Sequence, residues 1–386
     1  MNAWSQFLTP EAVTQEVIAG CIADIPAHLL DLGMGTGHLL AAAHLRWPRA
    51  RLLGVDIDAD KLHSARRRLP LAKCVHADAL RYDLPHLLGV KVGTIDLAVG
   101  NPPYGKFKAT EDHRHILEAV DLSDAISAKR ITREVVFLAQ NLRLLRHGGE
   151  LAVILPEGIG TAHFFAPLRQ ALMERHGLWR VLELPPRLFR NTEAKTMAFF
   201  LRKGMASQTV ELAHWNGSHI DLPTDEARRR LDASFFFARG HGQRTTLASL
   251  SPLIDRGAAT HRDARQLGVT VFHTTDFKNC VRGRARFPSA LDLPPRWLVE
   301  PGDILIPRVG ARCLNYAVMV KSGQAVFTDC VYRIRVAPSF RRPLLQYLSS
   351  SEGVAQRLTH AYGVCAKSLP KIDLLRLPIP DFHKGT

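Results

Sequence analysis

The segment whose residue types best suit chemistry is Asn101-Pro102-Pro103-Tyr104. The Asn101 side chain offers one acceptor and two donors, and Tyr104 adds a flat aromatic face. The two prolines fix φ and have no backbone donors, so they form a rigid loop. Such a loop suits the holding and stacking of a planar amino group. On these four residues alone, a structural turn without function fits equally well.

Polar residues recur at the ends of short apolar runs before this loop. They are Asp31, Asp56, Asp78 and Asn101, at steps of 25, 22 and 23 residues. Each step is the length of a strand plus a helix, so the pattern predicts an α/β fold with a doubly wound, mostly parallel sheet. Ligands bind such sheets beyond the carboxyl ends of the strands. There, Asp56 can accept hydrogen bonds from both hydroxyls of a ribose, and Asp78 can face an adenine amino group.

A glycine-rich loop follows the first of these strands. Gly33, Gly35 and Gly37 allow the backbone to approach a ligand closely, and the helix after them offers backbone N–H groups. The spacing differs from those of the dinucleotide-binding and phosphate-binding glycine motifs. Upstream, Thr9 as the N-cap and Pro10 at the first helical position predict a helix start.

The order of these motifs resembles that of class I S-adenosylmethionine-dependent methyltransferases, whose fold is Rossmann-like. More narrowly, it resembles the gamma class of enzymes that methylate adenine N6 in DNA, of which TaqI-type enzymes are the model. The resemblance implies S-adenosyl-L-methionine as the cofactor. The residues that it assigns to cofactor binding are Phe7, Thr9, Pro10, Asp31, Gly33, Gly35, Asp56, Ile57, Asp78, Ala79 and Asn101.

The same resemblance assigns the catalytic residues to Asn101, Pro102, Pro103 and Tyr104. The Asn101 side chain and the Pro102 carbonyl would accept hydrogen bonds from the amino group. Tyr104 and Phe189 would stack on an adenine that has flipped out of the duplex, because its N6 is inaccessible inside the helix. Protein glutamine methyltransferases and some RNA enzymes share the loop, so the loop identifies a planar amino acceptor more firmly than it identifies DNA.

The last part of the chain differs in charge and pattern. The formal net charge is +15, and residues 241–386 hold 21 Lys and Arg against 10 Asp and Glu. This imbalance indicates a polyanionic partner, for which double-stranded DNA is the expectation. The interpretation is a methyltransferase domain over 1–240 and an α+β target-recognition domain over 241–386. Its candidate DNA contacts are Arg282, Arg284, Arg286, Arg308 and Arg312, most of them to phosphates.

Secondary structure in this part is predicted as strands at 301–310 and 325–336 and one helix over 344–361. Its turns resemble target-recognition domains of type I specificity subunits and TaqI-type enzymes. No apolar run is long enough for a membrane span, and the N-terminus lacks the features of a signal peptide. The six cysteines are scattered without a CxxC pair, so we expect a cytoplasmic protein with neither disulfides nor a metal site.

Four functions remain open on the sequence. The first is an adenine-N6 DNA methyltransferase, expected to be a monomer that acts with a cognate restriction endonuclease or alone. The second is an rRNA or tRNA adenine methyltransferase, which explains both the loop and the charge. The third, a protein glutamine methyltransferase, does not explain the basic C-terminal part. The fourth is an inactive DNA-binding specificity protein that uses only that part.

Overall fold

The computed structural model describes residues 9–185, 195–239, 245–288, 291–310, 313–363 and 367–382. The chain divides into two compact units, Met1–Ala233 and Ser234–Thr386. The division lies a few residues before position 240, where the sequence pattern changes. Phe7, Phe189 and Arg312, which the sequence nominates for function, lie outside the described residues.

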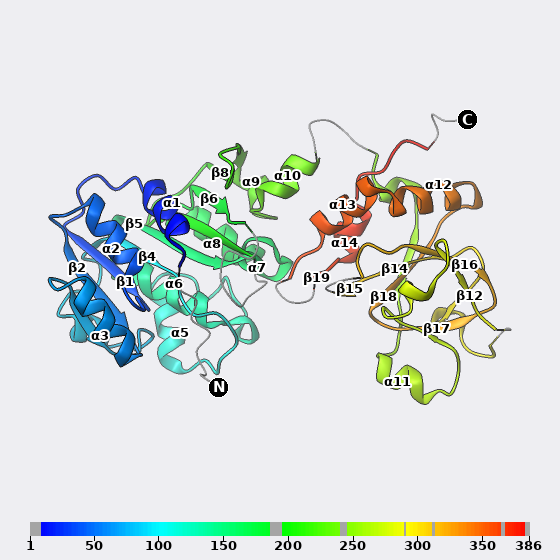
Figure 1. The fold of residues 1–386 in the computed structure, drawn as a ribbon, viewed down its shortest axis with the longest axis horizontal. Helices are drawn as coiled ribbons and strands as arrows, with labels where there is room; N and C mark the ends of the chain where they lie inside the picture. Colours follow the sequence, from blue (N-terminus) through cyan, green and yellow to red (C-terminus); the bar gives the residue numbers. More distant parts are fainter. Residues whose placement is uncertain are drawn as a thin grey trace. The chain divides into compact units, whose positions relative to one another are not determined.

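The first unit corresponds to the predicted methyltransferase domain, and after that prediction we call it the catalytic unit. It is built on a central sheet that has nine strands within the described residues (Figure 1). Their order is β3-β2-β1-β4-β5-β7-β6-β8-β9. The strands are β1 (His28–Leu32), β2 (Arg51–Asp56), β3 (Lys73–His76), β4 (Ile95–Gly100), β5 (Leu145–Pro156), β6 (Arg180–Glu183), β7 (Thr196–Arg202), β8 (Thr209–His214) and β9 (His219–Pro223).

Strands β1 to β5 of this sheet are parallel to one another, and β7 runs antiparallel between β5 and β6. The mostly parallel α/β sheet expected from the sequence is therefore confirmed. Residues of β1, β4 and β7 are buried almost throughout, which requires cover on both faces of the sheet. This explains why their sequences are continuous apolar runs rather than alternating ones.

Helices supply that cover. They are α1 (Glu11–Gly20), α2 (His38–Arg46), α3 (Ala59–Arg68), α4 (Leu84–Leu88), α5 (Glu111–Glu118), α6 (Arg133–Leu144), α7 (Glu157–Thr161), α8 (Ala166–His176) and α9 (Thr224–Ala227), with the short 3-10 turns η1 (Ala128–Arg130) and η2 (His163–Phe165). One apolar cluster joins α1, α2 and α3 to the strands beneath them, with Val17, Leu40, Leu62 and Phe200 fully buried. The core thus holds the strand ends rigidly.

The strand order reverses between β1 and β4. From β1 the chain proceeds outward to β2 and β3, and it then returns to add β4 on the other side of β1. The loops that leave β1 and β4 therefore emerge side by side at the carboxyl edge. This is the position where open α/β sheets bind ligands.

The second unit, which we call the C-terminal unit, begins within α10 (Ala233–Arg239) and has both strands and helices (Figure 1). Its described part contains a five-stranded sheet in the order β10-β18-β14-β16-β12, with a three-stranded and a two-stranded sheet. The strands are β10 (Leu253–Arg256), β11 (Val271–Phe272), β12 (Arg284–Arg286), β13 (Leu298–Val299), β14 (Ile304–Pro307), β15 (Val309–Gly310), β16 (Val318–Ser322), β17 (Ala325–Phe327), β18 (Val331–Arg335) and β19 (Lys367–Ser368).

The helices of this unit are α11 (His261–Gln266), α12 (Pro338–Ser349), α13 (Ser351–His360) and α14 (Lys371–Leu375), with the 3-10 turns η3 (Leu247–Leu250), η4 (Phe277–Asn279) and η5 (Pro295–Trp297). An apolar cluster packs residues of α12 and α14 against the larger sheet, with Ile304, Ile334 and Leu348 fully buried. Within the described residues of the whole chain, no helix has the length and apolarity needed to cross a membrane.

Three element predictions for the C-terminal part are wrong in detail. The helix expected over 344–361 is two helices, because the Ser350 side chain accepts a hydrogen bond from Gly353 N–H at 3.1 Å and starts α13. The stretch 325–336 breaks between β17 and β18, which belong to different sheets, and 301–310 likewise divides into β14 and β15. Hydrophobic content predicts strands but does not show where a chain changes sheet.

Candidate active site

The glycine loop lies between β1 and α2 and adopts a conformation that only glycine accommodates easily. Gly33, Gly35 and Gly37 all have positive φ, at 74°, 56° and 80°. A Cβ on Gly33 would also come within 3.4 Å of the Phe137 ring on α6. Backbone hydrogen bonds from Gly33 and Met34 to the Val55 carbonyl, at 2.8 and 2.9 Å, tie the loop to β2. The loop is therefore fixed against both of its neighbours.

Asp31, at the end of β1, is a buried carboxyl group. Its side chain is 1% exposed, and its Oδ1 has no hydrogen-bond partner. Burial, reinforced by the nearby charge of Asp56, raises the pKa of Asp31 well above its ordinary value. A cationic ligand in the adjoining cavity would give this carboxyl group the partner that it lacks.

Asp56, at the end of β2, is equally buried but satisfied. Its Oδ2 accepts a hydrogen bond from Gly35 N–H at 2.7 Å, and its Oδ1 accepts one from Asp58 N–H at 2.8 Å. Asp78 is less buried, and its Oδ1 accepts from Leu80 N–H at 2.9 Å. Each carboxylate oxygen has a further lone pair, so these contacts shape the loops without using up the acceptors.

A cavity at the carboxyl edge brings part of the nominated set together. Its lining is Thr9, Asp31, Gly33, Met34, Gly35, Thr36, His38, Leu39, Lys61 and Asn101. Pro10, Asp56, Ile57, Asp78 and Ala79, although nominated for the cofactor, are not part of this lining. His38 and Lys61, which the sequence motifs do not single out, stand in the first turns of α2 and α3. The first turn of a helix that follows a parallel strand is the signal that identifies them.

The Asn101–Tyr104 loop after β4, predicted from the sequence to be catalytic, is organised by two hydroxyl groups. Asn101 Nδ2 donates to Thr9 Oγ1 at 3.2 Å, and the Tyr104 hydroxyl donates to Asn101 Oδ1 at 2.8 Å. The Tyr104 hydroxyl also lies 3.3 Å from the Ile154 carbonyl of β5. Burial, with the charge of Glu134 as a second cause, raises the pKa of Tyr104 well above its ordinary value, so this hydroxyl stays protonated. The Asn101 amide is thereby oriented from both sides.

The N-terminal helix start differs from its prediction. Thr9 does not cap α1: the N-cap position is held by Pro10, which makes no side-chain cap. The first turn is completed by Thr14, whose N–H and hydroxyl both donate to the Pro10 carbonyl. The Thr9 side chain is engaged with Asn101 instead, which links residues 92 positions apart.

The exit of the catalytic loop is pinned to the start of α6. Gly105 N–H donates to Glu134 Oε2 at 2.9 Å, and Arg133 N–H donates to the Gly105 carbonyl at 3.1 Å. Glu134 is 6% exposed, and burial raises its pKa. These contacts hold Tyr104 in place from its carboxyl side.

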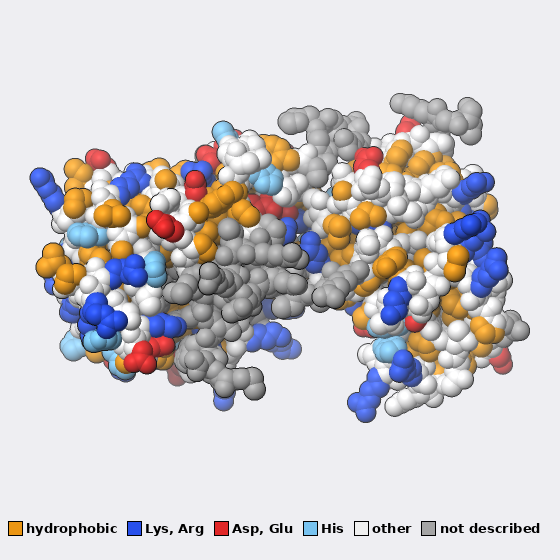
Figure 2. Space-filling model, viewed as in Figure 1, with side chains coloured by type: hydrophobic (Ala, Val, Ile, Leu, Met, Phe, Trp, Pro, Cys, Tyr) orange, Lys and Arg blue, Asp and Glu red, His pale blue; other side chains and the backbone are white. Residues whose placement is uncertain are grey.

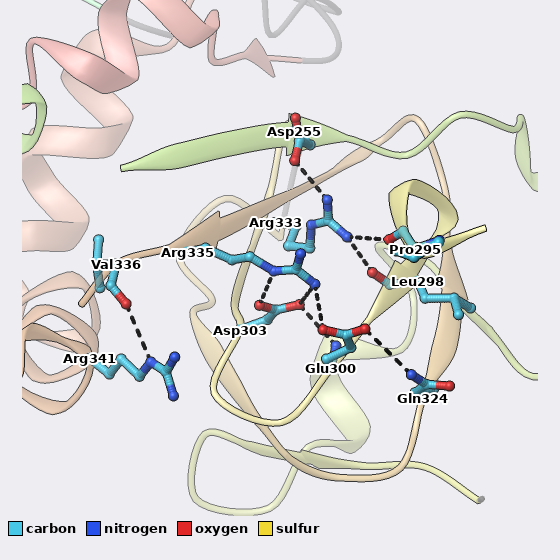
Figure 3. A network of polar contacts seen from close by, with 10 residues as sticks. All are labelled: Asp255, Pro295, Leu298, Glu300, Asp303, Gln324, Arg333, Arg335, Val336 and Arg341. Atoms are coloured by element: carbon cyan, nitrogen blue, oxygen red, sulfur yellow. Dashed lines mark hydrogen bonds and ion pairs between the residues drawn. The ribbon is translucent and has the colours of Figure 1, made fainter. Parts of the chain in front are cut away.

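Two groups among the described arginines of the C-terminal unit bear on the predicted DNA contacts. In the first, the guanidinium groups are engaged within the unit, as the network around Arg333 and Arg335 shows (Figure 3). Arg335 Nε donates to Asp303 Oδ1 and Arg333 donates to Asp255 Oδ2, both at 2.7 Å. Arg308, nominated for DNA, belongs here: its Nε donates to the Asp329 carbonyl at 2.6 Å.

Arg282, Arg284 and Arg286 form the second group. All three are exposed and line a concavity of about 710 Å³ that also includes Asp276 and Asn279. Arg284 and Arg286 point outward from β12, the edge strand of the larger sheet, while Ala285 between them is buried. Arg282 stands at the tip of a tight turn with φ 50°, followed by Gly283 with φ 68°.

The fold and the carboxyl-edge site together define a methyltransferase of the class I type, for which S-adenosylmethionine is the methyl donor. The N-6 DNA methylase family matches residues 2–234. The chain belongs to this family.

Curated relatives agree on the methyltransferase and differ in substrate. The chain is 26% identical to trans-aconitate 2-methyltransferase of Azoarcus sp. (strain BH72) over 237 residues, which are 61% of this chain and 76% of that protein. It is 24% identical to type II methyltransferase M.CvrRI of Paramecium bursaria Chlorella virus XZ-6E over 198 residues, or 51% of this chain and 48% of the relative. The chain thus spans about half the length of the second relative.

A solved structure extends the likeness to both units. The type IIG restriction endonuclease BpuSI aligns with 97% of this chain and 59% of its own, at 13% identity and a TM-score of 0.55. At this identity the similarity concerns the fold alone. It covers the C-terminal unit as well as the catalytic unit.

Proposed function

We propose that this protein transfers a methyl group from S-adenosyl-L-methionine to the N6 amino group of a flipped-out adenine in double-stranded DNA. The observation that carries the proposal is the oriented amide of Asn101, held between the hydroxyls of Thr9 and Tyr104 beside the glycine loop. Membership in the N-6 DNA methylase family supports an exocyclic amino acceptor.

Asn101 and Pro102 act on the acceptor. The Asn101 Oδ1 and the Pro102 carbonyl accept hydrogen bonds from the two amino hydrogens, which draws electron density onto nitrogen and aims its lone pair. As the amino group gains the methyl group that the cofactor would supply, it would lose one proton to water. S-adenosylmethionine supplies a methyl group that is already activated, so positioning provides most of the rate. The Tyr104 ring, with Phe189, holds the base plane.

The residues at the carboxyl edge fit this cofactor. Asp31 offers a buried, partnerless carboxyl oxygen to a cationic ligand, and the glycine loop offers backbone in a positive-φ conformation that residues with a Cβ rarely adopt. We assign the ribose hydroxyls to Asp56 and the adenine to Asp78, with Ile57 and Ala79 beside them. Phe7 and Pro10 complete the set that the family resemblance nominates.

We assign DNA binding in the C-terminal unit to the edge formed by Arg282, Arg284 and Arg286. A residue other than glycine at positive φ costs roughly 1–3 kcal/mol, a strain that is typical of functional tips. Most contacts should be to phosphates, and one arginine at the turn can reach a guanine edge. Arg308 is the weakest of the five nominated arginines because it is already bonded to Asp329.

The biological setting follows from the proposed chemistry. We place the enzyme in the cytoplasm as a monomer that acts on duplex DNA. It works either with a cognate restriction endonuclease or as a solitary methyltransferase.

Expression in a host without adenine methylation tests the proposal. Single-molecule sequencing of the host DNA should show N6-methyladenine at one sequence motif, and the Asn101→Ala variant should leave the DNA unmodified. Methyl groups found only in rRNA, tRNA or a protein glutamine would replace the proposal by one of its alternatives. Tight cofactor binding by calorimetry would exclude an inactive specificity protein.

A further inference from the structure

Two segments that are distant in sequence meet directly behind the catalytic loop. Lys106 and Thr132 form an isolated antiparallel bridge, and Arg133 N–H donates to the Gly105 carbonyl. The chain between Lys106 and Thr132 contains α5 and η1, and its two ends are paired with each other by this bridge. The bridge therefore places 105–108 beside 129–133, within a few residues of Tyr104.

Basic residues occupy both sides of this bridge. Lys106 and Lys108 follow the catalytic loop, and Lys129 and Arg130 precede α6. All four side chains are exposed, and in the part of the chain that the structure describes none of them forms an ion pair with a carboxylate. The acidic residues of the same segment, from Glu111 to Asp124, lie between its two basic ends. We call Lys106, Lys108, Lys129 and Arg130 the neck cations.

Aromatic rings lie among these charges. The Arg130 guanidinium stands 4.0 Å over the ring of Phe164, which is 41% exposed on η2. Arg133 lies 5.8 Å from the Phe107 ring. Because η2 follows α7 and β5, this group also belongs to the carboxyl edge of the sheet. Cations interleaved with partly exposed rings are typical of surfaces that follow a nucleic-acid backbone.

Charge alone does not single out this surface, because Lys and Arg side chains are spread over the visible face of both units (Figure 2). The position does. The backbone bridge fixes the neck cations next to Asn101–Tyr104, where the phosphates on either side of a bound nucleotide must lie. The exposed Arg49, Arg51 and Lys91, by contrast, stand at the amino ends of the strands, at the opposite edge of the sheet.

We infer that the neck cations form a phosphodiester-binding surface that grips the strand on both sides of the nucleotide presented to Asn101 and Tyr104. This inference rests on the proposed function and adds a second nucleic-acid contact, inside the catalytic unit. The C-terminal unit would position the duplex, and the neck cations would hold the strand whose base is extruded. Their contacts are to the backbone, so they carry no sequence preference.

The test neutralises the surface and compares it with a matched set. One variant carries Lys106→Ala, Lys108→Ala, Lys129→Ala and Arg130→Ala. Its control carries Arg49→Ala, Arg51→Ala, Arg67→Ala and Lys91→Ala, which removes the same charge from exposed positions away from the carboxyl edge. Binding of a duplex DNA and of a duplex RNA of equal length is measured by fluorescence anisotropy from about 50 to 200 mM salt, together with cofactor binding by calorimetry.

The wild-type protein is measured first, because its preference for DNA or RNA tests the proposed function separately from the phosphodiester-binding surface. If it binds and methylates RNA and not DNA, the proposed function fails while the surface is still tested on RNA. With the preferred nucleic acid, the neck variant should bind 10- to 100-fold more weakly, and its salt slope should fall by about 0.9 for each phosphate that the variant no longer neutralises. The control should change less than twofold, and cofactor affinity should stay the same in both.

Equal weakening in the neck variant and its control would overturn the inference, since only total charge would then matter. An unchanged salt slope in the neck variant would overturn it as well. If the quadruple variant does not fold, the single variants Lys108→Ala and Lys129→Ala are compared with Lys91→Ala on the same slope. A decrease of about 0.9 in the first two alone would support the surface.

Discussion

Polar side chains are placed by different means in the two units. In the catalytic unit, Asp31, Asp56 and Asn101 stand at the ends of parallel strands, so the sheet itself brings them to one edge. In the C-terminal unit, an arginine acquires its role from partners far along the chain. Arg333 reaches Asp255, 78 residues away, whereas Arg284 faces outward from an edge strand.

The difference teaches which substitutions should affect chemistry and which should affect folding. The side chain of a residue at a strand end can be replaced without loss of the strand, so the variant should fold but have a lower turnover rate. Replacing an arginine that is bonded inside its unit should lower the stability of that unit. Replacing an arginine on an exposed edge should weaken only DNA binding.

Asn101→Ala should have the largest effect. It removes the side-chain acceptor that orients the amino group, so turnover should fall on the order of 10³-fold, the scale found when a preorganised polar group is lost. DNA affinity should change less than twofold. Methyl transfer from labelled cofactor measures the first, with Asn216→Ala at an exposed turn as the control. Near-normal turnover would show that the Asn101 side chain, at the end of β4, does not act on the amino acceptor.

Arg333→Ala should destabilise the C-terminal unit by about 3 kcal/mol, because it removes a guanidinium that is 3% exposed, together with its hydrogen bonds to the carbonyls of Pro295 and Leu298 and its ion pair with Asp255. Hydrogen exchange of the full chain should show lost protection within 245–382 and unchanged protection of β1 and β4. Arg284→Ala is the comparison, and its stability should change by less than about 0.5 kcal/mol. Equal effects would remove the distinction between the two groups of arginines.

Replacing Arg282, Arg284 and Arg286 together by Ala should weaken DNA binding by roughly 10- to 100-fold at about 0.1 M salt, with a lower salt slope. Cofactor binding and stability should be preserved, since these side chains are exposed. The matched control replaces Arg262, Arg265 and Arg342, which are also exposed. Should both triple variants bind DNA equally well, the edge would have no special role.

Asp31→Asn should have the smallest effect, and the size of its effect on stability should depend on pH. The folded-state pKa of Asp31 is raised, so the free protein loses stability as the pH rises above the unfolded value of about 3.9 and toward the folded value. The variant should therefore be more stable than wild type at pH 8 and bind the cationic cofactor more weakly. Thermal unfolding from pH 5 to 8, with and without cofactor, measures both. Lower stability in the free variant would contradict this account of Asp31.

The sequence pattern is sufficient to predict the strands of the first unit, because each strand is signalled by residues that are neighbours in the sequence. Each apolar run that ends in a polar residue predicts a strand, and the steps between Asp31, Asp56, Asp78 and Asn101 predict parallel strands with helices between them. The hydrogen bond between Thr9 and Asn101 is beyond such a pattern, since nothing local connects residues 92 positions apart. The same limit explains why the sequence predicts Thr9 as a helix cap.

The second unit is harder to predict because its information is not local. Strands β17 and β18 are separated by three residues and belong to different sheets. Arg308 and Arg284 have the same chemistry in the sequence, and only the fold shows that one is bonded to Asp329 and the other lies on an exposed edge. Burial and pairing, rather than residue type, decide the role of a basic side chain.

Identification of the methylated product gives the most direct test of the central claim. The purified protein is incubated with isotopically labelled S-adenosylmethionine and duplex DNA, duplex RNA or protein extract, and the products are digested and separated by mass spectrometry. The account predicts label in N6-methyladenine from DNA, with none from the Asn101→Ala variant. Label in RNA or in a glutamine side chain, or on another base of DNA, would contradict it.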